Sequence, residues 1–512
     1  MFEVHQPIRI KELKEALIES SSSYRRPSDI FNNIYDKELE KKIFHKVSDR
    51  CYLDATSLIK NLLMSHPSFK VVFSLSGLWL EQAKKFNPNL LEILKEVASL
   101  GRVEFLCQTY FHSLSSLNPN GLDEFREQIL LHKKMMEEVF DYTPKSVENT
   151  ELIYNNDIGH ELFDAGFKVT VTEGVERVLK GRSPHHVYSA YGCDLKLLLR
   201  DYKMSDDIGF RFSNKIWDQY PLMADKYASW VDTADGDLVL ISVDYETFGE
   251  HHDKSTGILE FLKWLPVYFK RKGISFNTVT EAVENLESVG VFDVPPWDTI
   301  SWADIEKDDS AWLGNEMQWR AFKTLCWLEP YVKAVRKHYI EYWRRLGTSD
   351  LYHYMAAKHG TSGEVHEYFN PFKTPLAAFD VYIKAVSVLA YAVINEYLEC
   401  INLNAWKIKC PRALAFRLYN SKGKEMISID GLKQLSDSLR NLSPEIISSH
   451  IKRGDLQRWI KEILLWNEFA EEVDQIAGED SKIIVKNLLE LLKSKKEVIN
   501  KNSSKIISSE SK

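Results

Sequence analysis

The order of apolar runs over the first 290 or so residues constrains the fold more than any other feature of this sequence. Short runs rich in β-branched and aromatic residues alternate with longer amphipathic stretches that have the spacing of helices. This alternation is typical of βα units around a parallel sheet. The number of units favours a closed (β/α) barrel over an open sheet, although periodicity alone leaves both possible. The predicted strands are 2–5, 71–75, 103–107, 146–151, 168–172, 195–199, 238–244 and 274–277.

The spacing of apolar residues changes after Pro295 and Pro296. Long stretches at 309–345 and 376–398 carry apolar residues three and four positions apart, which predicts a helical domain packed on the barrel and lining its cleft. A later strand-like run, a turn and amphipathic helices predict a small α+β module, and the Ser- and Lys-rich end from residue 495 predicts disorder. The predicted divisions are 1–295 for the barrel, 296–404 for the helical domain, 405–478 for an accessory module and 479–512 for a helical end with a disordered tail.

Charge and composition exclude several classes of function. Acidic residues number 74 against 66 basic ones, and no extended basic stripe is present, so nucleic acid is not an expected partner. The first residues lack the pattern of a signal peptide and no run approaches 18 apolar residues, so we expect a cytoplasmic, soluble protein without a membrane partner. The six single cysteines argue against a zinc ribbon or a disulfide framework. Motifs for phosphate binding and acyl transfer are absent.

Two acids lie where the ends of predicted strands would bring them together. Glu151 follows the strand in KSVENTE, and Asp244 closes the strand in DLVLISVDYE. The carboxyl ends of barrel strands carry the chemistry, and hydrolysis of a glycosidic bond with retention requires two carboxyl groups about 5–5.5 Å apart. Each acid alone also has a structural explanation, since Glu151 could open a helix and Asp244 could cap one.

Other polar and aromatic residues follow the same strand ends. Side chains of these kinds can hydrogen-bond sugar hydroxyls, although a histidine beside a strand is often structural. His251 and His252 with nearby carboxylates would also suit a metal, but their spacing fits no standard motif and no metal is expected. Trp302, Trp312 and Trp319 could stack on sugar rings or fill the core. The polar candidates are His5, Gln6, Gln108, His112, Glu246 and His251.

The strings HQP, VEFLCQTYFHSL, NTELIYNN, DYETFGEHH and FNTVTEA occur in this order along the chain. With them the chain resembles glycoside hydrolase family 57, in particular its archaeal-type α-amylase branch, from residue 1 to about residue 400. The resemblance implies an incomplete, seven-stranded (β/α) barrel with a helical domain beside the cleft. It also implies cleavage of α-1,4-linked glucans or maltooligosaccharides by double displacement, without a cofactor.

Position by position, the resemblance implies roles for particular residues. The family's nucleophile falls on Glu151 and its general acid/base on Asp244, while Gly101 and Glu104 match the second family motif. Gln108 stands where close relatives tend to have Glu, and Val279 stands where Pro is common. Trp302 and Trp312 look like the aromatic residues that wall the cleft. The predicted substrate-binding residues are His5, Gln6, Glu104, His112, Glu246, His251, Trp302 and Trp312.

Three alternatives remain open at the level of sequence. Glucan transfer, by a 4-α-glucanotransferase or a branching enzyme, would use the same covalent intermediate with a sugar hydroxyl in place of water. A metal-dependent polysaccharide deacetylase would also place Asp and His at strand ends of a related barrel. A non-catalytic glucan-binding protein is disfavoured because both Glu151 and Asp244 are present.

Overall fold

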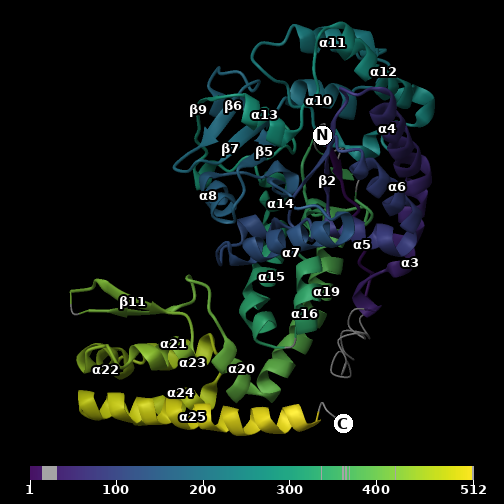
Figure 1. Ribbon diagram of the computed structural model, residues 1–512. Coiled ribbons are helices and arrows are strands. Elements are labelled where there is room, and N and C mark those ends of the chain that lie inside the picture. The colour runs from purple at the N-terminus through teal and green to yellow at the C-terminus, as the bar shows by residue number, and fades with distance from the viewer. Residues whose placement is uncertain are drawn as a thin grey trace.

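Parallel strands form the centre of the N-terminal part of the molecule (Figure 1). The computed structural model describes residues 1–13, 32–335, 337–359, 363, 366–367, 370–420 and 422–509. One sheet has the strand order β3-β2-β1-β8, and the other has the order β4-β5-β7-β6-β9. The strands are β1 (Phe2–Val4), β2 (Val71–Leu75), β3 (Val103–Leu106), β4 (Ser146–Glu148), β5 (Val169–Glu173), β6 (Val187–Ala190), β7 (Lys196–Arg200), β8 (Val243–Asp244) and β9 (Ser288–Phe292).

Two isolated parallel bridges join the two sheets. Cys107 pairs with Val147 beside β3 and β4, and Arg200 of β7 pairs with Leu240 just before β8. Parallel pairing therefore runs from β1 through β2, β3, β4, β5 and β7 to β8, which pairs again with β1. The predicted α/β fold is confirmed, and the carboxyl ends of these strands meet on one side.

The strand residues explain this arrangement. Every position of β2 and β5 is buried, as expected for parallel strands covered on both faces. The predicted strand at 274–277 is wrong, since these residues form no strand. Their apolar side chains are satisfied by packing instead, because the Phe276 ring lies 5.0 Å from that of Phe69 and 5.2 Å from that of Phe269.

Helices surround the strands (Figure 1). Five of the eleven helices named below begin with a side-chain cap: Ser76, for example, accepts a hydrogen bond from the backbone N–H of Trp79 at the start of α5. These helices are α3 (Lys37–Val47), α4 (Leu53–Ser65), α5 (Gly77–Phe86), α6 (Pro88–Ser99), α7 (Asp123–Phe140), α8 (Asn156–Asp164), α9 (Glu176–Leu179), α10 (Tyr202–Gly209), α11 (Ala224–Asp232), α12 (Ile258–Arg271) and α13 (Val279–Asn285).

A second group of helices follows the barrel strands. The helical stretch predicted at 309–345 is divided, because Gly314 ends the first helix and Asn315 forms a capping box for the next. By length and composition α19 could cross a membrane, but half of its apolar window is buried and the helix packs on α15. The helices are α14 (Ser310–Leu313), α15 (Glu316–Ala334), α16 (Lys337–Arg345), α17 (Ser349–His353), α19 (Pro375–Glu399) and α20 (Ile401–Lys407).

The C-terminal segment lies at the far end of α15 and α19 from the barrel, in yellow tones at the lower left of Figure 1. The last helix runs to Ser509, and the disorder predicted from residue 495 stays a prediction. Ile484, Leu488 and Leu492 are buried at four-residue spacing and anchor this helix, and the residues that follow include good helix formers. The elements are β10 (Phe416–Tyr419), β11 (Glu425–Ile429), α21 (Leu432–Ser438), α22 (Pro444–Lys452), α23 (Asp455–Glu462), α24 (Asn467–Gln475) and α25 (Ser481–Ser509).

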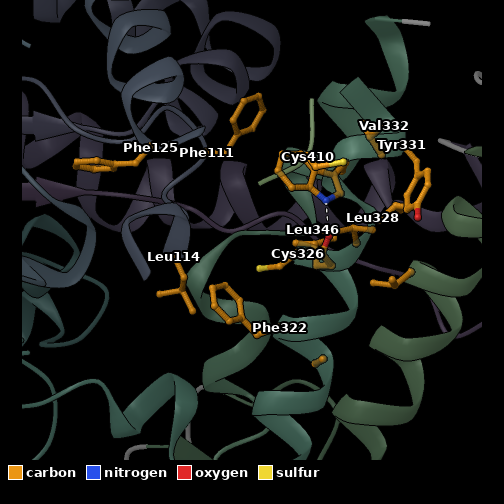
Figure 2. Close-up of a cluster of buried hydrophobic side chains, with 14 of the residues drawn as sticks. Phe111, Leu114, Phe125, Phe322, Cys326, Leu328, Tyr331, Val332, Leu346 and Cys410 are labelled. Carbon is orange, nitrogen blue, oxygen red and sulfur yellow. Dashed lines mark hydrogen bonds between the residues drawn. The ribbon is translucent and has the colours of Figure 1, made fainter. Parts of the chain in front are cut away.

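One hydrophobic core continues from the barrel into the helices. Figure 2 shows Phe111 and Leu114, from the loop after β3, in the same cluster as Phe322 and Leu328 of α15. Cys410, just before the C-terminal hairpin, belongs to this cluster as well. Shared apolar packing therefore fixes the helices relative to the strand ends, and α17 is held where its side chains reach them.

Candidate active site

Glu151 has a strained backbone and a fully oriented carboxylate. Its φ of 61° lies in the left-handed region, and so does that of Leu152 at 53°. Oε2 accepts a hydrogen bond of 2.8 Å from Nε1 of Trp302, and Oε1 accepts one of 2.8 Å from Oγ of Ser349. Such a conformation costs about 1–3 kcal/mol and persists where the surroundings fix it, often at functional sites. The loop with Trp302 and helix α17 supply that fixation.

His112 favours the ionised form of Glu151. Its Nε2 lies 3.5 Å from Oε1 of Glu151, and its Nδ1 lies 3.0 Å from Oε1 of Gln108. Burial raises the pKa of Glu151, but the hydrogen bond and charge of His112 outweigh burial and leave that pKa below its ordinary value. Burial lowers the pKa of His112, yet Glu151 outweighs it and the net pKa is raised. The two residues therefore favour an imidazolium beside a carboxylate.

His5 lies against a face of the His112 ring. The two rings stack with their centroids 3.9 Å apart and an interplanar angle of 21°. Nδ1 of His5 is 2.7 Å from Oγ of Ser76, and Nε2 is 3.0 Å from Oδ2 of Asp350 on α17. Burial and the charge of His112 lower the pKa of His5 to about 4, so His5 is neutral. The tautomer with a proton on Nε2 satisfies both contacts.

Asp244 carries the opposite pKa shift to Glu151. It is the last residue of β8 and pairs with Glu3 of β1. Burial and the charge of Glu151 raise the pKa of Asp244 to about 7, against a partial lowering by Arg200. Burial and the charge of Asp244 also raise the pKa of Glu246, to about 8. Near neutral pH the site therefore combines an ionised Glu151 with a substantially protonated Asp244.

The predicted binding residues Gln6, Glu246 and His251 lie together beside Asp244. Oε1 of Glu246 accepts a hydrogen bond from the hydroxyl of Tyr52, and the Gln6 side chain contacts both of these groups. His251 is half-buried, and its backbone N–H donates to the carbonyl of Glu246 at 2.9 Å. The loop after β1 and the loop after β8 are thus tied together at the site.

Two predicted binding residues, Glu104 and Trp312, are buried and make their contacts within the protein. Glu104 is 3% exposed, and its oxygens accept hydrogen bonds from Ser146 and from both the hydroxyl and the backbone N–H of Thr280. It joins β3 to α13, and both of its buried oxygens already accept hydrogen bonds inside the protein. Trp312 is 1% exposed within the hydrophobic core, so its ring presents no face to a ligand. Both side chains have structural positions inside the protein. The sequence pattern does not distinguish such positions from positions in a binding site.

Sequence reasoning missed two acids beneath the site. Glu3 of β1 is 3% exposed and Glu148 of β4 is fully buried. Burial and the charge of Glu148 raise the pKa of Glu3 well above its ordinary value, and burial raises the pKa of Glu148 to about 7. One of the two carboxyl groups therefore stays protonated at neutral pH. Glu3 stands between two apolar residues of a predicted strand and Glu148 follows Val147 in another, and acids in such segments are a signal that could have identified both.

Three further residues came from segments that no motif marked. Ser349 and Asp350 belong to α17, about 200 residues after Glu151. Ser349 donates to Glu151 and Asp350 contacts His5, and no local pattern predicts either contact. Arg200 ends β7, donates to Glu173 at 2.9 Å and places its guanidinium 5.4 Å from the ring centre of Trp302. Ser349 orients Glu151 directly, whereas Arg200 lies over Trp302 and Asp350 holds His5.

The histidines considered as metal ligands are used differently. Nε2 of His252 lies 2.9 Å from the carbonyl oxygen of Ile208, and Nδ1 lies 2.8 Å from Oγ of Ser213. His252 therefore ties the loop after β8 to α10 and its following turn. Across the part of the chain that the structure describes, no group of three or more His, Cys, Asp and Glu side chains is placed to hold a metal ion.

The fold and site together define an α/β enzyme of the glycoside hydrolase class, with two acids whose pKa values diverge at the carboxyl ends of parallel strands. Comparison with known proteins agrees. Residues 1–295 match the family model of glycosyl hydrolase family 57. A protein of Methanocaldococcus jannaschii provisionally named an alpha-amylase is 41% identical over 403 residues, which cover 77% of this chain and 84% of that protein. The chain belongs to glycosyl hydrolase family 57, as its motifs predicted.

Other relatives are more distant. An alpha-amylase of Pyrococcus abyssi is 23% identical over 148 residues, which cover 29% of this chain and 22% of that protein. A branching enzyme of Thermococcus kodakaraensis shares the fold with a TM-score of 0.54 and 14% identity, over 78% of this chain and 90% of that chain. A branching enzyme of Pyrococcus horikoshii gives a TM-score of 0.53 and 14% identity, over 72% of this chain and 86% of that chain.

Proposed function

We propose that the protein is a retaining hydrolase of α-1,4-glucosidic bonds in glycogen, starch or maltooligosaccharides. The proposal is carried by the opposite pKa shifts of Glu151, which is held and oriented at the strand ends, and Asp244, because double displacement needs one carboxylate and one carboxylic acid at the same bond. Family membership and the relative named an alpha-amylase support the substrate class. On this proposal, the circuit of seven parallel strands is the incomplete (β/α) barrel implied by the family motifs.

In the first step, an oxygen of Glu151 attacks the anomeric carbon while the bond to the leaving oxygen breaks. The proton of Asp244 passes to that oxygen, and a covalent glycosyl-enzyme remains. In the second step, Asp244 accepts a proton from water, whose oxygen attacks the same carbon and releases Glu151. Two inversions at one carbon retain its configuration.

The pKa values suit both steps. Once Glu151 is esterified, its negative charge is lost, and with it one cause of the raised pKa of Asp244. The pKa of Asp244 then falls, so the group that donated a proton becomes a better base for the second step. Trp302 and Ser349 keep the attacking carboxylate in place through their hydrogen bonds.

Substrate hydroxyls would meet a polar wall around this centre. We assign to it His5, Gln6, His112, Glu246 and His251, which line the ends of β1, β3 and β8 or the loops after them. Trp302 is half-buried beside Glu151 and offers indole surface next to the reacting carbon.

Glucan transfer is the second candidate activity. The solved structures that share this fold include branching enzymes, and a sugar hydroxyl can replace water in the second step without any change to the first. The length of the products on a defined oligosaccharide separates the two outcomes.

Replacing the nucleophile tests the assignment of Glu151. The Glu151→Ala variant should lose turnover by a factor of about 10⁴ or more while keeping its fold, and added azide should enter the vacated face to give a β-configured sugar azide. Glu260→Ala on α12, a glutamate with a 64% exposed side chain, is the control. Turnover in Glu151→Ala equal to that of the control, or an α-configured azide product, would reject this role for Glu151.

A further inference from the structure

A surface hollow lies beside the loop that carries Trp302. Its volume is about 410 Å³, and one of its walls is the indole of Trp297, which is 88% exposed. Tryptophan is enriched at binding interfaces, because its indole offers a large apolar face together with an N–H donor. The hollow is lined by Arg177, Pro296, Trp297, Asp298, Thr299, Glu306, Asp308 and Asp309.

The backbone around Trp297 is held in place. Arg177 donates from Nε to Oδ1 of Asp298 at 2.8 Å and from Nη1 to the carbonyl of Glu306 at 2.9 Å. Thr299 accepts a hydrogen bond from Nδ2 of Asn155 at 2.9 Å through its hydroxyl oxygen. The hollow is thus formed before any ligand arrives, which lowers the entropic cost of binding.

The hollow also lies on the same side of the strands as the acids. Arg177 belongs to α9, which follows the carboxyl end of β5 after a short turn. Trp297 precedes Trp302 by five residues, so their Cα atoms are at most about 18 Å apart, and Trp302 donates directly to Glu151. A chain bound across Glu151 therefore has a short path to Trp297.

We propose that this hollow binds a segment of the glucan chain outside the catalytic centre, with Trp297 as its platform. The apolar face of a sugar ring suits an indole, and its hydroxyl groups donate to carboxylates such as those of Glu306 and Asp309. Four acidic side chains against one arginine disfavour an anionic ligand. This inference rests on the proposed function, since it identifies the substrate as a chain long enough to occupy both places.

Binding without turnover tests this inference. In a Glu151→Gln background, migration through native gels that contain glycogen measures affinity directly. Trp297→Ala should weaken the affinity about 5-fold to 10-fold, the effect of losing one aromatic contact, and Trp297→Phe should restore part of it. Trp264→Ala, on α12 with a 44% exposed ring, is the matched control and should migrate like its parent. Equal melting temperatures would show that all variants fold.

Turnover of maltotriose by proteins with an intact Glu151 tests the proposed function separately. A weaker glycogen affinity in Trp297→Ala, but not in Trp264→Ala, supports the second site whether or not maltotriose is cleaved. Equal affinities of Trp297→Ala and its parent overturn it, even where maltotriose turnover upholds the hydrolase. A parent protein that glycogen does not retard overturns it too.

Discussion

Glu151 and Asp244 are both carboxylic acids, and their surroundings give them opposite protonation. Glu151 receives hydrogen bonds from Trp302 and Ser349 and faces His112, which stabilise its charge. Asp244 is half-buried beside that charge and remains protonated to a higher pH. The neutral His5, stacked on His112, completes the arrangement without adding a second positive charge.

The rate should follow these two groups as pH changes. Because Asp244 must be protonated, kcat/KM for maltoheptaose should fall as pH rises through about 7. Because Glu151 must be ionised and its pKa is lowered, the acid limb should lie below the ordinary value of 4.5. A profile measured between pH 3 and pH 9 at constant ionic strength checks both limbs. A rate that stays constant from pH 6 to pH 9 would contradict the role of Asp244.

Much of this site could be predicted from the sequence, because strand-end motifs mark His5, Glu151 and Asp244. The contacts of Ser349 and Asp350 could not, because α17 reaches the site through packing between distant segments and no local pattern encodes that. For Glu104 and Trp312, the sequence predicted contacts with substrate although both side chains are buried. Their residue types fit a sugar site, but burial and hydrogen bonding, which a sequence does not display, give them structural positions.

At the level of elements, the parallel strands were predictable because most are short runs that carry β-branched, aromatic or leucine residues, and the helix at 375–399 because of its spacing. The segment 274–277 has the composition of a strand yet packs without pairing. The composition of a segment indicates whether it is buried. Whether it forms a strand also depends on a neighbouring strand with a free edge to pair with. The strand β9, which pairs with β6 outside the parallel circuit, was missed for the same reason.

Glu104 should stabilise the contact between β3, β4 and α13 and should not affect substrate binding. In Glu104→Ala, donors on Ser146 and Thr280 lose their acceptor inside the protein, so the free energy of unfolding should fall by at least about 2 kcal/mol. The KM for maltoheptaose should change less than twofold. Chemical denaturation and steady-state kinetics measure the two effects, with Glu92→Ala on α6, 65% exposed, as control. Normal stability with a raised KM would return Glu104 to the substrate site.

On the scale of the whole molecule, the helices after the barrel connect the strand ends to the C-terminal segment. The continuous core in Figure 2 joins residues from the loop after β3 to α15 and to Cys410. Two buried tyrosines add polar links: Tyr331 donates to the carbonyl of Ile463 at 3.1 Å, and Tyr397 donates to that of Leu464 at 2.7 Å. The C-terminal segment thus bears on stability through α15 and α19, at the end away from the acids.

Removing one of these links should change stability but leave catalysis intact. Tyr397→Phe leaves a buried carbonyl of Leu464 without its donor, which should lower the free energy of unfolding by about 1–3 kcal/mol. Tyr391→Phe, on the same helix and 42% exposed, should have little effect and serves as control. Urea denaturation measures stability. A kcat for maltoheptaose that falls in Tyr397→Phe but not in Tyr391→Phe would instead indicate coupling between this segment and the site.

The products formed from maltoheptaose test the central claim most directly. Purified protein, with Glu151→Gln and Asp244→Asn variants alongside, is incubated with this substrate and the products are separated by length. The proposed mechanism predicts only chains shorter than the substrate, and none from either variant. Chains longer than seven units would contradict hydrolysis as the activity, and unchanged cleavage by either variant would contradict the roles of Glu151 and Asp244.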